Sequence, residues 1–222
     1  MAKAAKRKAK TQKTPGGAAS GERMRRSSDP VEAMLLLVAA EGWRAVSLGR
    51  IATACGLSLS DLYGRYASKT DLLIAYAKRI DAAMLEALGP MPAEAEAAAV
   101  KDRLFEAIMA RLDALAPHKA AVRVLMRELP ADPAALMCFL YGGLRRGIDW
   151  TLAAAELDSP GLAGILRRKV LGAIYLDTLR VWLRDESADM ETTMAHLDKR
   201  LRQAMNCLNA GGFLSRLRRN VV

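Results

Sequence analysis

Apolar residues recur at helical spacing along most of the chain between Asp29 and Asn209, and no segment alternates apolar and polar residues as a half-buried strand does. Spacings of three and four residues place apolar side chains on one face of a helix. The composition agrees, because hydrophobic residues make up 52% of the 222 residues while aromatic residues reach only 5%. The pattern predicts an all-α fold of about nine helices, in one large domain or two small ones, and argues against a β-sandwich or barrel.

The first four predicted helices have clear starts. Each begins after a residue with a side-chain oxygen, namely Asp29, Ser47, Ser58 and Ser68. Such an oxygen accepts hydrogen bonds from the unpaired N–H groups of the first turn. The second and third helices, Leu48–Cys55 and Leu59–Tyr66, are separated by a short turn that begins with glycine, which is typical of a helix-turn-helix. We expect Ile51, Ala52 and Leu62 to form the apolar contact between these two helices.

This segment resembles the DNA-binding domain of the TetR family over about 50 residues without a gap. The residues that carry the resemblance are Val46 to Ser58, Leu62-Tyr63, Tyr66, Ser68-Lys69 and Leu72-Leu73. The resemblance implies that the helix Leu59–Arg65 lies in the major groove of double-stranded DNA. The positions that match DNA-facing positions of the family are Ser47, Ser58, Leu59, Ser60, Asp61, Tyr63, Gly64, Arg65 and Lys69.

Individual roles follow from the same resemblance. It implies that Ser47 caps the second helix near a phosphate, that Tyr63 touches the DNA backbone, and that the Lys69 ammonium meets a phosphate. This chain has Leu59 where the family frequently has a polar or basic residue, and Asp61 where it frequently has Ser or Thr. It has Gly64 where the family frequently has a large side chain. These three positions are the departures from the common pattern.

The formal net charge of +10 lies at the two ends of the chain. Residues 1–26 carry +8, residues 211–222 carry +3, and residues 27–210 carry −1. We expect residues 1–28 to form a disordered basic arm, because they hold too few apolar residues to offset the entropy of ordering. The arm either keeps the protein soluble or attracts DNA through its phosphates, without reading the sequence.

Five further helices are expected beyond a break at 89–92. They cover about 100–115, 117–129, 133–156, 160–184 and 189–209, with Asp189 opening the last. Glycines interrupt the apolar pattern of two of these helices, at Gly142, Gly143, Gly147, Gly161, Gly164 and Gly172. Glycine destabilises a helix interior, so these positions indicate either close helix packing or room for a ligand.

Polar side chains on the same apolar helices are candidates for orienting a ligand in an apolar cavity. The candidates for ligand binding are Arg145, Asp149, Tyr175 and Thr178, with Asp177 and His196 nearby. The alternative is that these groups are solvent-exposed or paired within the fold. The TetR resemblance implies that this part of the chain binds a small apolar or lipid effector and that its last two helices form a four-helix interface in a homodimer.

The C-terminal part resembles Coq-type accessory proteins of ubiquinone biosynthesis. The resemblance rests on Ala173 to Thr178, Trp182, Asp185 to Asp189, Thr192-Thr193 and Leu197 to Leu201. It implies the same fold with lipid as ligand rather than DNA, and a terminal amphipathic helix that touches membrane. Residues 210–222 fit a basic amphipathic tail with weak membrane contact through 211–222, or else a frayed solvated end.

The domain division that follows is a basic arm at 1–28, a helix-turn-helix domain at 29–75, an effector-binding and dimerisation domain at 76–209, and a tail at 210–222. Catalytic, metal and dinucleotide motifs are missing from the sequence, so we expect no enzyme, no cofactor and no metal site. Three scattered cysteines, Cys55, Cys138 and Cys207, fit a reducing cytoplasm.

The sequence thus favours a TetR-like DNA-binding regulator. Two alternatives stay open: a lipid-binding accessory protein of ubiquinone biosynthesis with a residual helix-turn-helix, and a nucleoid-associated protein that acts through its basic arm alone.

Overall fold

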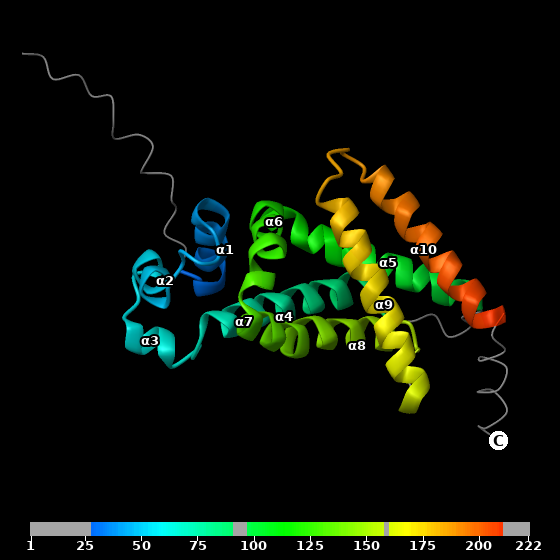
Figure 1. Cartoon of the computed structure of the whole chain (residues 1–222), viewed down its shortest axis with the longest axis horizontal. Helices are drawn as coiled ribbons and strands as arrows, with labels where there is room; N and C mark the ends of the chain where they lie inside the picture. Colours follow the sequence, from blue (N-terminus) through cyan, green and yellow to red (C-terminus); the bar gives the residue numbers. More distant parts are fainter. Residues whose placement is uncertain (1–27, 91–96, 158–159, 211–222) are drawn as a thin grey trace, which may run out of the picture.

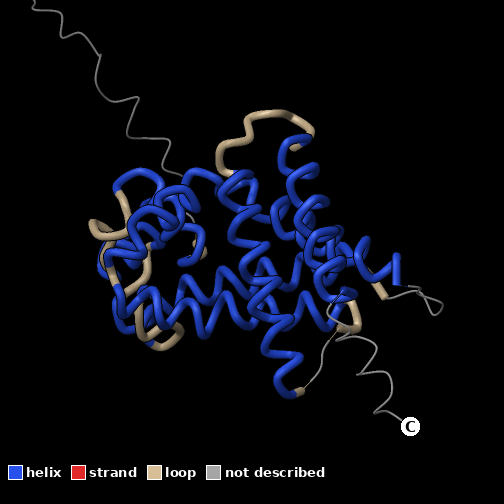
Figure 2. The backbone as a smooth tube through the Cα atoms, turned by 45° about the vertical axis from the view of Figure 1, so that its right-hand side comes forward, coloured by secondary structure: helices blue, strands red, loops and turns tan. Residues whose placement is uncertain are grey.

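The computed structural model describes residues 28–90, 97–157 and 160–210, which contain ten α-helices and no strand (Figures 1 and 2). The helices are α1 (Pro30–Glu41), α2 (Leu48–Cys55), α3 (Leu59–Tyr63), α4 (Lys69–Leu88), α5 (Ala97–Leu115), α6 (Lys119–Glu128), α7 (Pro133–Phe139), α8 (Arg145–Ala154), α9 (Gly161–Trp182) and α10 (Glu191–Ala210). The all-α prediction is confirmed for this part of the chain. Nearly all of the expected arm and the tail at 211–222 lie outside the described residues. None of the described helices is long and apolar enough to cross a membrane.

The predicted caps explain where the first four helices begin. The oxygens of Asp29, Ser47, Ser58 and Ser68 each accept a hydrogen bond from an N–H of the first turn, over 3.1–3.4 Å. Gly42 and Gly56 end α1 and α2 with φ values of 94° and 69°, a region in which glycine carries no Cβ penalty. The caps therefore make the boundaries of these short helices a local property of the sequence.

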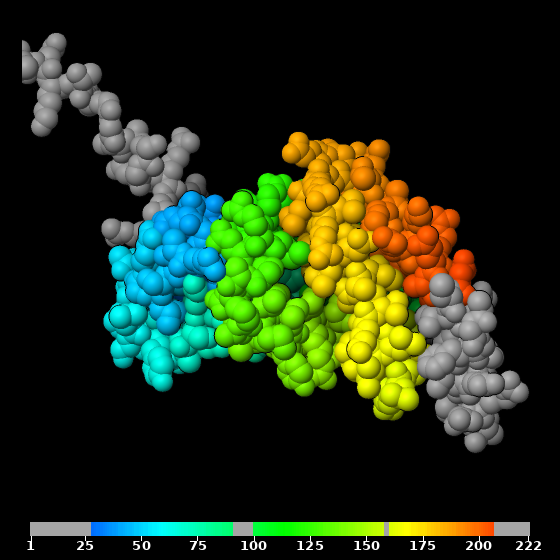
Figure 3. Space-filling view, in the orientation of Figure 1, coloured from blue at the N-terminus to red at the C-terminus, as the bar shows by residue number. Residues whose placement is uncertain are grey.

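The third helix is shorter than expected, because α3 ends at Tyr63 instead of Tyr66. Beyond Tyr63 the chain tightens into a turn in which the N–H of Arg65 bonds the carbonyl of Leu62 at 3.0 Å. The expected contact residues Ile51, Ala52 and Leu62 are all buried. We call α1–α3 and α4 up to residue 75 the head, which forms one end of the molecule (Figures 1 and 3).

The remaining helices form the body, and α4 joins it to the head. This helix runs without a break through the domain boundary expected at residue 75 and then packs along α5. In the body, α9 packs against both α8 and α10, and α10 also contacts α5 (Figure 1). The head touches the body a second time where α1 packs against α6.

The long helix expected at 133–156 is interrupted by a π-helical turn at Leu140–Leu144 between α7 and α8. Gly142 and Gly143 lie in this turn. A Cβ at Gly142 would come within 2.8 Å of Ile74 Cδ1, and a Cβ at Gly143 within 3.4 Å of Ala77 Cβ. Both contacts are with α4, so these glycines allow two helices to approach closely. A Cβ at Gly143 would also come within 2.8 Å of Phe139, and Gly143 lines a cavity of the body, so both roles considered for these glycines find support.

The start of α10 differs from the expectation that Asp189 opens it. The helix begins at Glu191, and the carboxylate of Asp185 bonds its first turn, accepting from the N–H of Thr193 at 2.9 Å and from its hydroxyl at 2.7 Å. The other oxygen of Asp185 accepts from the Ser187 hydroxyl and N–H. The connection between α9 and α10 folds back over this side chain, a contact that local spacing does not reveal.

Candidate functional site

The turn between α2 and α3, together with α3 itself, forms a polar surface on the head. The predicted DNA-facing residues that are solvent-exposed here are Ser47, Ser58, Leu59, Ser60, Asp61, Tyr63, Gly64 and Arg65. Leu59 is 59% exposed and Tyr63 is 72% exposed, although Leu62, between them on the same helix, is only 1% exposed. The single buried face of α3 therefore holds the helix, and its other side chains are available for contact.

The carboxylate of Asp61 is engaged in a helix cap. It accepts hydrogen bonds from the hydroxyl of Ser58 at 2.7 Å and from the N–H of Ser58 at 3.4 Å, while the Ser58 hydroxyl oxygen accepts from the N–H of Asp61. The Ser58 hydroxyl lowers the pKa of Asp61. This reciprocal arrangement is a capping box, so the departure from the family pattern at this position has a local structural role.

Lys69 differs from the other predicted DNA-facing residues, because its ammonium is turned into the head. Its Nζ donates to the carbonyls of Trp43 at 2.6 Å and Val46 at 2.9 Å, and it lies 4.1 Å from the centroid of the Trp43 ring. Burial lowers the pKa of Lys69, against the opposing effect of Asp132. Lys69 thus fastens the loop between α1 and α2 to α4. The predicted phosphate contact would require it to leave these carbonyls.

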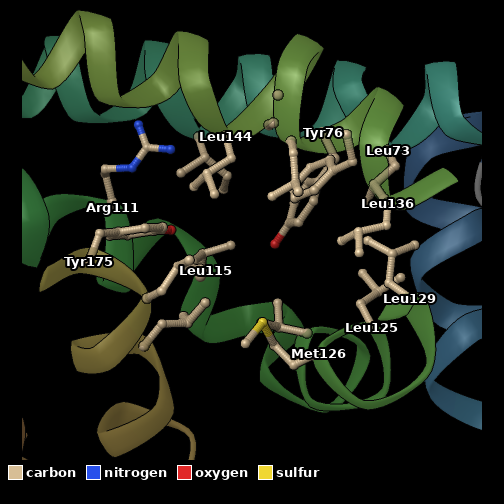
Figure 4. A pocket seen from close by; sticks show the side chains of 18 of the residues that line it. Leu73, Tyr76, Arg111, Leu115, Leu125, Met126, Leu129, Leu136, Leu144 and Tyr175 are labelled. Atoms are coloured by element: carbon tan, nitrogen blue, oxygen red, sulfur yellow. The ribbon is translucent and has the colours of Figure 1, made fainter. Parts of the chain in front are cut away.

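The body contains a cavity of about 240 Å³ between α4, α5, α6, α7 with the π-helical turn that follows it, and α9 (Figure 4). Its wall is mainly apolar and is formed chiefly by leucines with Val122, Met126 and Phe139. The polar side chains on the wall are few, as in many ligand cavities: Tyr76, Arg111, Tyr175 and Arg180.

A buried charge cluster lies beside this cavity. Arg111 is 3% exposed and donates from Nη1 to Oδ1 of Asp81, which is 4% exposed, at 2.6 Å. Arg146 donates to the other oxygen of Asp81 at 3.4 Å. Burial alone would lower the pKa of Arg111, but Tyr175 and Asp81 outweigh it and the pKa is raised. The guanidinium therefore stays charged, and two guanidinium groups share one carboxylate.

Room for this cluster comes from Gly147 of α8. A Cβ at this position would come within 2.5 Å of Arg111 Nη2 and 2.8 Å of Asp81 Oδ1. Gly147 thus makes room for charged side chains, whereas Gly142 and Gly143 make room for apolar side chains.

The structure does not bring the four predicted ligand-binding residues together. Tyr175 lines the cavity, whereas Thr178 is fully buried without being part of the cavity wall. Arg145 lies in a separate groove between α8 and α9. Asp149 pairs with Arg145 at 3.8 Å and with Arg168 on α9. Their roles in ligand binding remain predictions, and only Tyr175 is placed where the cavity could use it.

Sequence reasoning missed Tyr76, Asp81 and Arg111. The available signal was a charge on an apolar face, since Arg111 occupies the helical stripe formed by Leu104, Ile108 and Leu115, which are all buried. A charged residue at such a position must be paired or functional when the helix is buried.

A hydrogen-bonded chain links the cavity wall to the head. The Tyr76 hydroxyl lies 3.2 Å from Nδ1 of His118, and Nε2 of His118 lies 2.9 Å from a carboxylate oxygen of Glu32 on α1. Burial raises the pKa of Tyr76, so its phenol keeps its proton. If the phenol donates to Nδ1, a neutral imidazole carries its hydrogen on Nε2 and donates it to Glu32. The body also contacts the head at the start of α7, where Trp43 Nε1 donates to Asp132 at 3.2 Å.

The last two helices are held together by a polar cluster. Asp177 on α9 accepts from His196 Nε2 at 2.9 Å and from Arg200 Nε at 2.8 Å, both on α10, and the His196 hydrogen bond is the main cause of its lowered pKa. No group of three or more His, Cys, Asp or Glu side chains suited to a metal ion lies within the described ranges.

Two segments match family models. Residues 32–76 match the bacterial regulatory proteins of the tetR family, and residues 165–208, which span most of α9 and α10, match COQ9. No curated protein matches the chain.

Solved structures of similar fold are transcriptional regulators. A TetR transcriptional regulator from Nitrosomonas europaea is 26% identical, with 81% of this chain and 97% of that chain covered and a TM-score of 0.60. A TetR transcriptional regulator from Rhodococcus sp. is 16% identical, with 82% and 96% covered and a TM-score of 0.54. A tetR-family regulator from Streptomyces coelicolor is 18% identical, with 86% and 90% covered and a TM-score of 0.53. The last two likenesses concern the fold alone.

The expected resemblances are therefore both found, each in its own part of the chain. The chain has the fold of TetR-family transcriptional regulators, matches the tetR family model over residues 32–76 of its head, and matches COQ9 over residues 165–208 of its body.

Proposed function

We propose that the chain is a DNA-binding transcriptional regulator that acts as a homodimer and by binding, not by catalysis. In this proposal residues 29–75 read double-stranded DNA, and residues 76–209 dimerise and bind a small apolar effector. The observation that carries the proposal is the exposed surface of Ser58–Arg65 on a well-packed head, within the segment that matches the tetR family model.

The head would read bases mainly through α3, since this helix exposes Leu59, Ser60 and Tyr63 around one buried leucine. Residues 27–80 carry a net charge of only +1, so the head alone offers little attraction to phosphates. The basic arm would supply the charge that raises overall affinity without adding specificity.

An apolar stripe at the start of α9 supports the proposed dimer. Leu162, Ile165 and Leu166 lie at helical spacing and are 83%, 44% and 43% exposed. Large exposed apolar side chains that share one helix face are typical of interfaces between proteins. We place them at the edge of a symmetric interface formed by α9 and α10 of two copies, as the TetR resemblance implies. Sedimentation of Leu162→Asp should then show a larger monomer fraction than that of the wild type.

The route from effector to head would use the chain from Tyr76 through His118 to Glu32. An effector in the cavity would lie against Tyr76 and displace its side chain, which would alter the hydrogen bond between its hydroxyl and His118. The altered bond would reach α1 through Glu32, and so change how the two heads are held for DNA.

Selection of binding sites from random DNA tests the proposal. A discrete palindromic site is expected, with half-sites spaced by about one helical turn. Tyr63→Ala should abolish selection of this site without loss of thermal stability, because the side chain is 72% exposed. Tyr141→Ala is the matched control, since Tyr141 is 71% exposed on the body and should leave site selection unchanged. Lys69→Ala is unsuitable, because it would also release the carbonyls of Trp43 and Val46.

Deletion of residues 1–26 separates this function from that of a nucleoid-associated protein. A regulator should keep its site preference and lose affinity at all sequences alike. Binding without sequence preference, abolished by the deletion and by moderate salt, would contradict the proposed function.

The match of residues 165–208 to COQ9 favours one other function, that of a lipid-binding accessory protein of ubiquinone biosynthesis. Co-purification of an isoprenoid lipid, with liposome flotation that depends on residues 211–222, would support it. Flotation that is unchanged by deleting 211–222 would count against the membrane contact.

A further inference from the structure

We propose that the cavity takes a single-chain amphiphile with a monoanionic head, a long-chain carboxylate, whose carboxylate lies against Arg111 and Tyr175. The inference rests on the proposed effector binding and names the chemical class of the effector. It starts from the distribution of charge and of apolar surface on the cavity wall.

The charge cluster beside the cavity is not balanced. Arg111 and Arg146 share the single carboxylate of Asp81, which leaves one positive charge in excess; Arg111 and Asp81 are almost completely buried, while the Arg146 side chain is 29% exposed. Solvent screens Arg146 in part, but the buried guanidinium of Arg111 would still be stabilised by a second anion close to it. A bound monoanion would supply that charge.

Arg111 also has a free hydrogen-bond donor. Its Nε is buried and has no hydrogen-bond partner among the described residues. Buried polar groups are nearly always paired, so an unpaired donor on a residue of the cavity wall indicates an acceptor that is brought by a ligand. Carboxylate oxygens are the acceptors that guanidinium groups bind best, because both groups are planar and oppositely charged.

The two ends of the cavity differ in character (Figure 4). Arg111 and Tyr175 lie together at one end, and the guanidinium carbon of Arg111 is 5.2 Å from the centroid of the Tyr175 ring. Leu125, Met126 and Leu129 close the other end. Tyr76 and Arg180 also line the wall, but only the first of these two ends holds a buried guanidinium, and this division matches a molecule with a charged head and an apolar tail.

The charge also distinguishes between classes of amphiphile. An alkylamine would bring a second cation to a site that already has one in excess. An alcohol with the same tail would fill the apolar end but leave the excess charge unbalanced. The carboxylate should therefore bind more tightly than either compound, with the tail length held constant.

The test measures binding of dodecanoate, dodecanol and dodecylamine to the DNA-free protein by calorimetry, with the two ionic compounds below their micelle concentrations and dodecanol below its solubility limit. Dodecanoate should bind at least about tenfold more tightly than dodecanol, as a charge-assisted hydrogen bond implies, and dodecylamine should bind more weakly than both. Equal affinity of dodecanoate and dodecanol would overturn the inference.

Variants locate the head of the ligand. Tyr175→Phe should reduce dodecanoate affinity several-fold and leave dodecanol affinity unchanged, while Tyr141→Phe, a tyrosine outside the cavity, should alter neither. Asp81→Asn removes the anion that competes for Arg111 and should increase the preference for dodecanoate over dodecanol.

Arg111→Met alone would leave Asp81 beside only Arg146 and could unfold the protein. The double variant Arg111→Met with Asp81→Asn removes the buried pair together. A folded double variant keeps the charge of Arg146 but lacks the unpaired Nε donor of Arg111, so its preference for dodecanoate over dodecanol should fall several-fold. A preference that stays at the wild-type level would place the carboxylate elsewhere and contradict the inference. These measurements contain no DNA, so the two proposals can fail separately. Selectivity for the carboxylate in a protein that selects no DNA site would contradict only the proposed regulator function. Specific DNA binding without selectivity for the carboxylate would contradict only the proposed ligand class.

Discussion

The head and the body use polar residues in opposite ways. In the head, polar side chains cap helices, face solvent or, in the case of Lys69, bond backbone carbonyls, and the core between α1, α2, α3 and α4 is apolar. In the body, charged side chains such as Asp81, Arg103 and Arg111 are buried, and an apolar cavity lies beside two of them. Among the described residues, no buried side-chain polar atom of the head lacks a hydrogen-bond partner, whereas in the body Arg111 Nε and Thr178 Oγ1 lack one. The proposed ligand binding is assigned to the body for this reason.

The largest effect on stability should come from the core of the head. Leu62→Ala removes a side chain that is 1% exposed and should reduce the free energy of unfolding by about 2–5 kcal/mol. Leu59→Ala on the same helix removes an exposed leucine and should change it by less than about 0.5 kcal/mol. Urea unfolding of both variants measures the difference. Similar losses in the two would show that α3 is not held through Leu62.

The buried pair of the body should come next. Arg111→Met leaves the Asp81 carboxylate with only Arg146, and we expect a loss of about 3 kcal/mol. Adding Asp81→Asn should restore part of that loss, because it removes the unpaired charge. If the double variant were less stable than Arg111→Met in urea unfolding, the pair would not be the source of the effect.

Asp185 gives the body a dependence on pH. Hydrogen bonds from the side chains of Ser187 and Thr193 hold the pKa of Asp185 well below its usual range. A carboxyl whose pKa is lowered by folding stabilises the fold above its unfolded pKa of about 4, and this contribution is lost as the pH falls through the folded value. Asp185→Asn should therefore lower the melting temperature at neutral pH, and its difference from the wild type should shrink as the pH falls below about 4.

Circular dichroism melts at a series of pH values measure this shift. Asp189→Asn is the control from the same loop, since Asp189 is exposed and should leave the melting temperature unchanged at every pH. A difference between Asp185→Asn and the wild type that stays constant with pH would contradict the assignment.

A smaller effect is expected at the cap of α3. Ser58→Ala removes both the oxygen that accepts from the Asp61 N–H and the hydroxyl bonded to its carboxylate, and should cost about 1 kcal/mol. Ser60→Ala, within the same helix, should cost less. Equal losses in thermal unfolding would argue that the capping box does not define this helix start.

The smallest effect on stability should be that of Glu32→Gln, which weakens a partly exposed pair with His118 by at most about 1 kcal/mol. Its effect on the coupling between ligand binding and DNA binding should be the largest of the series. In fluorescence-anisotropy titrations, the change in DNA affinity that dodecanoate causes should be reduced, while the affinity for each ligand alone is kept. Unaltered coupling would exclude the route through His118.

Local signals in the sequence were enough to predict the head. Its caps at Ser47 and Ser58, its turn glycine and its contact at Ile51 and Leu62 are set by residues within a few positions of one another. Local signals also explain why the end of α3 was predicted at Tyr66 instead of Tyr63. The exposed last turn can tighten without changing the spacing of the apolar residues that predicted the helix. The family resemblance pointed to the exposed residues on and around α3, but it did not reveal that the Lys69 ammonium bonds the carbonyls of Trp43 and Val46.

The candidate site of the body was mostly not predictable, because its residues meet only through packing. Asp81 and Arg111 are thirty positions apart, and His118 lies 86 positions from Glu32. Arg145 and Asp149 looked equally suitable in sequence, yet the helix turns them to the other side of α8. The π-helical turn at Leu140–Leu144 adds to the difficulty, since it shifts the register between α7 and α8.

The unbroken course of α4 has a consequence for anyone who builds hybrid regulators from this chain. Its 20 residues carry Leu72 of the head core at one end and Ile80 of the cavity wall nearer the other. A crossover placed at residue 75 would cut this helix. The cavity residues before and after the cut would then come from different parent chains. A crossover at Gly89–Pro90 keeps the helix whole, but the transplanted head then brings a strip of its original cavity with it. The proposed DNA-binding and effector-binding surfaces would thus be inherited together along one helix, and a change in the proposed effector preference would need substitutions on both sides of the crossover.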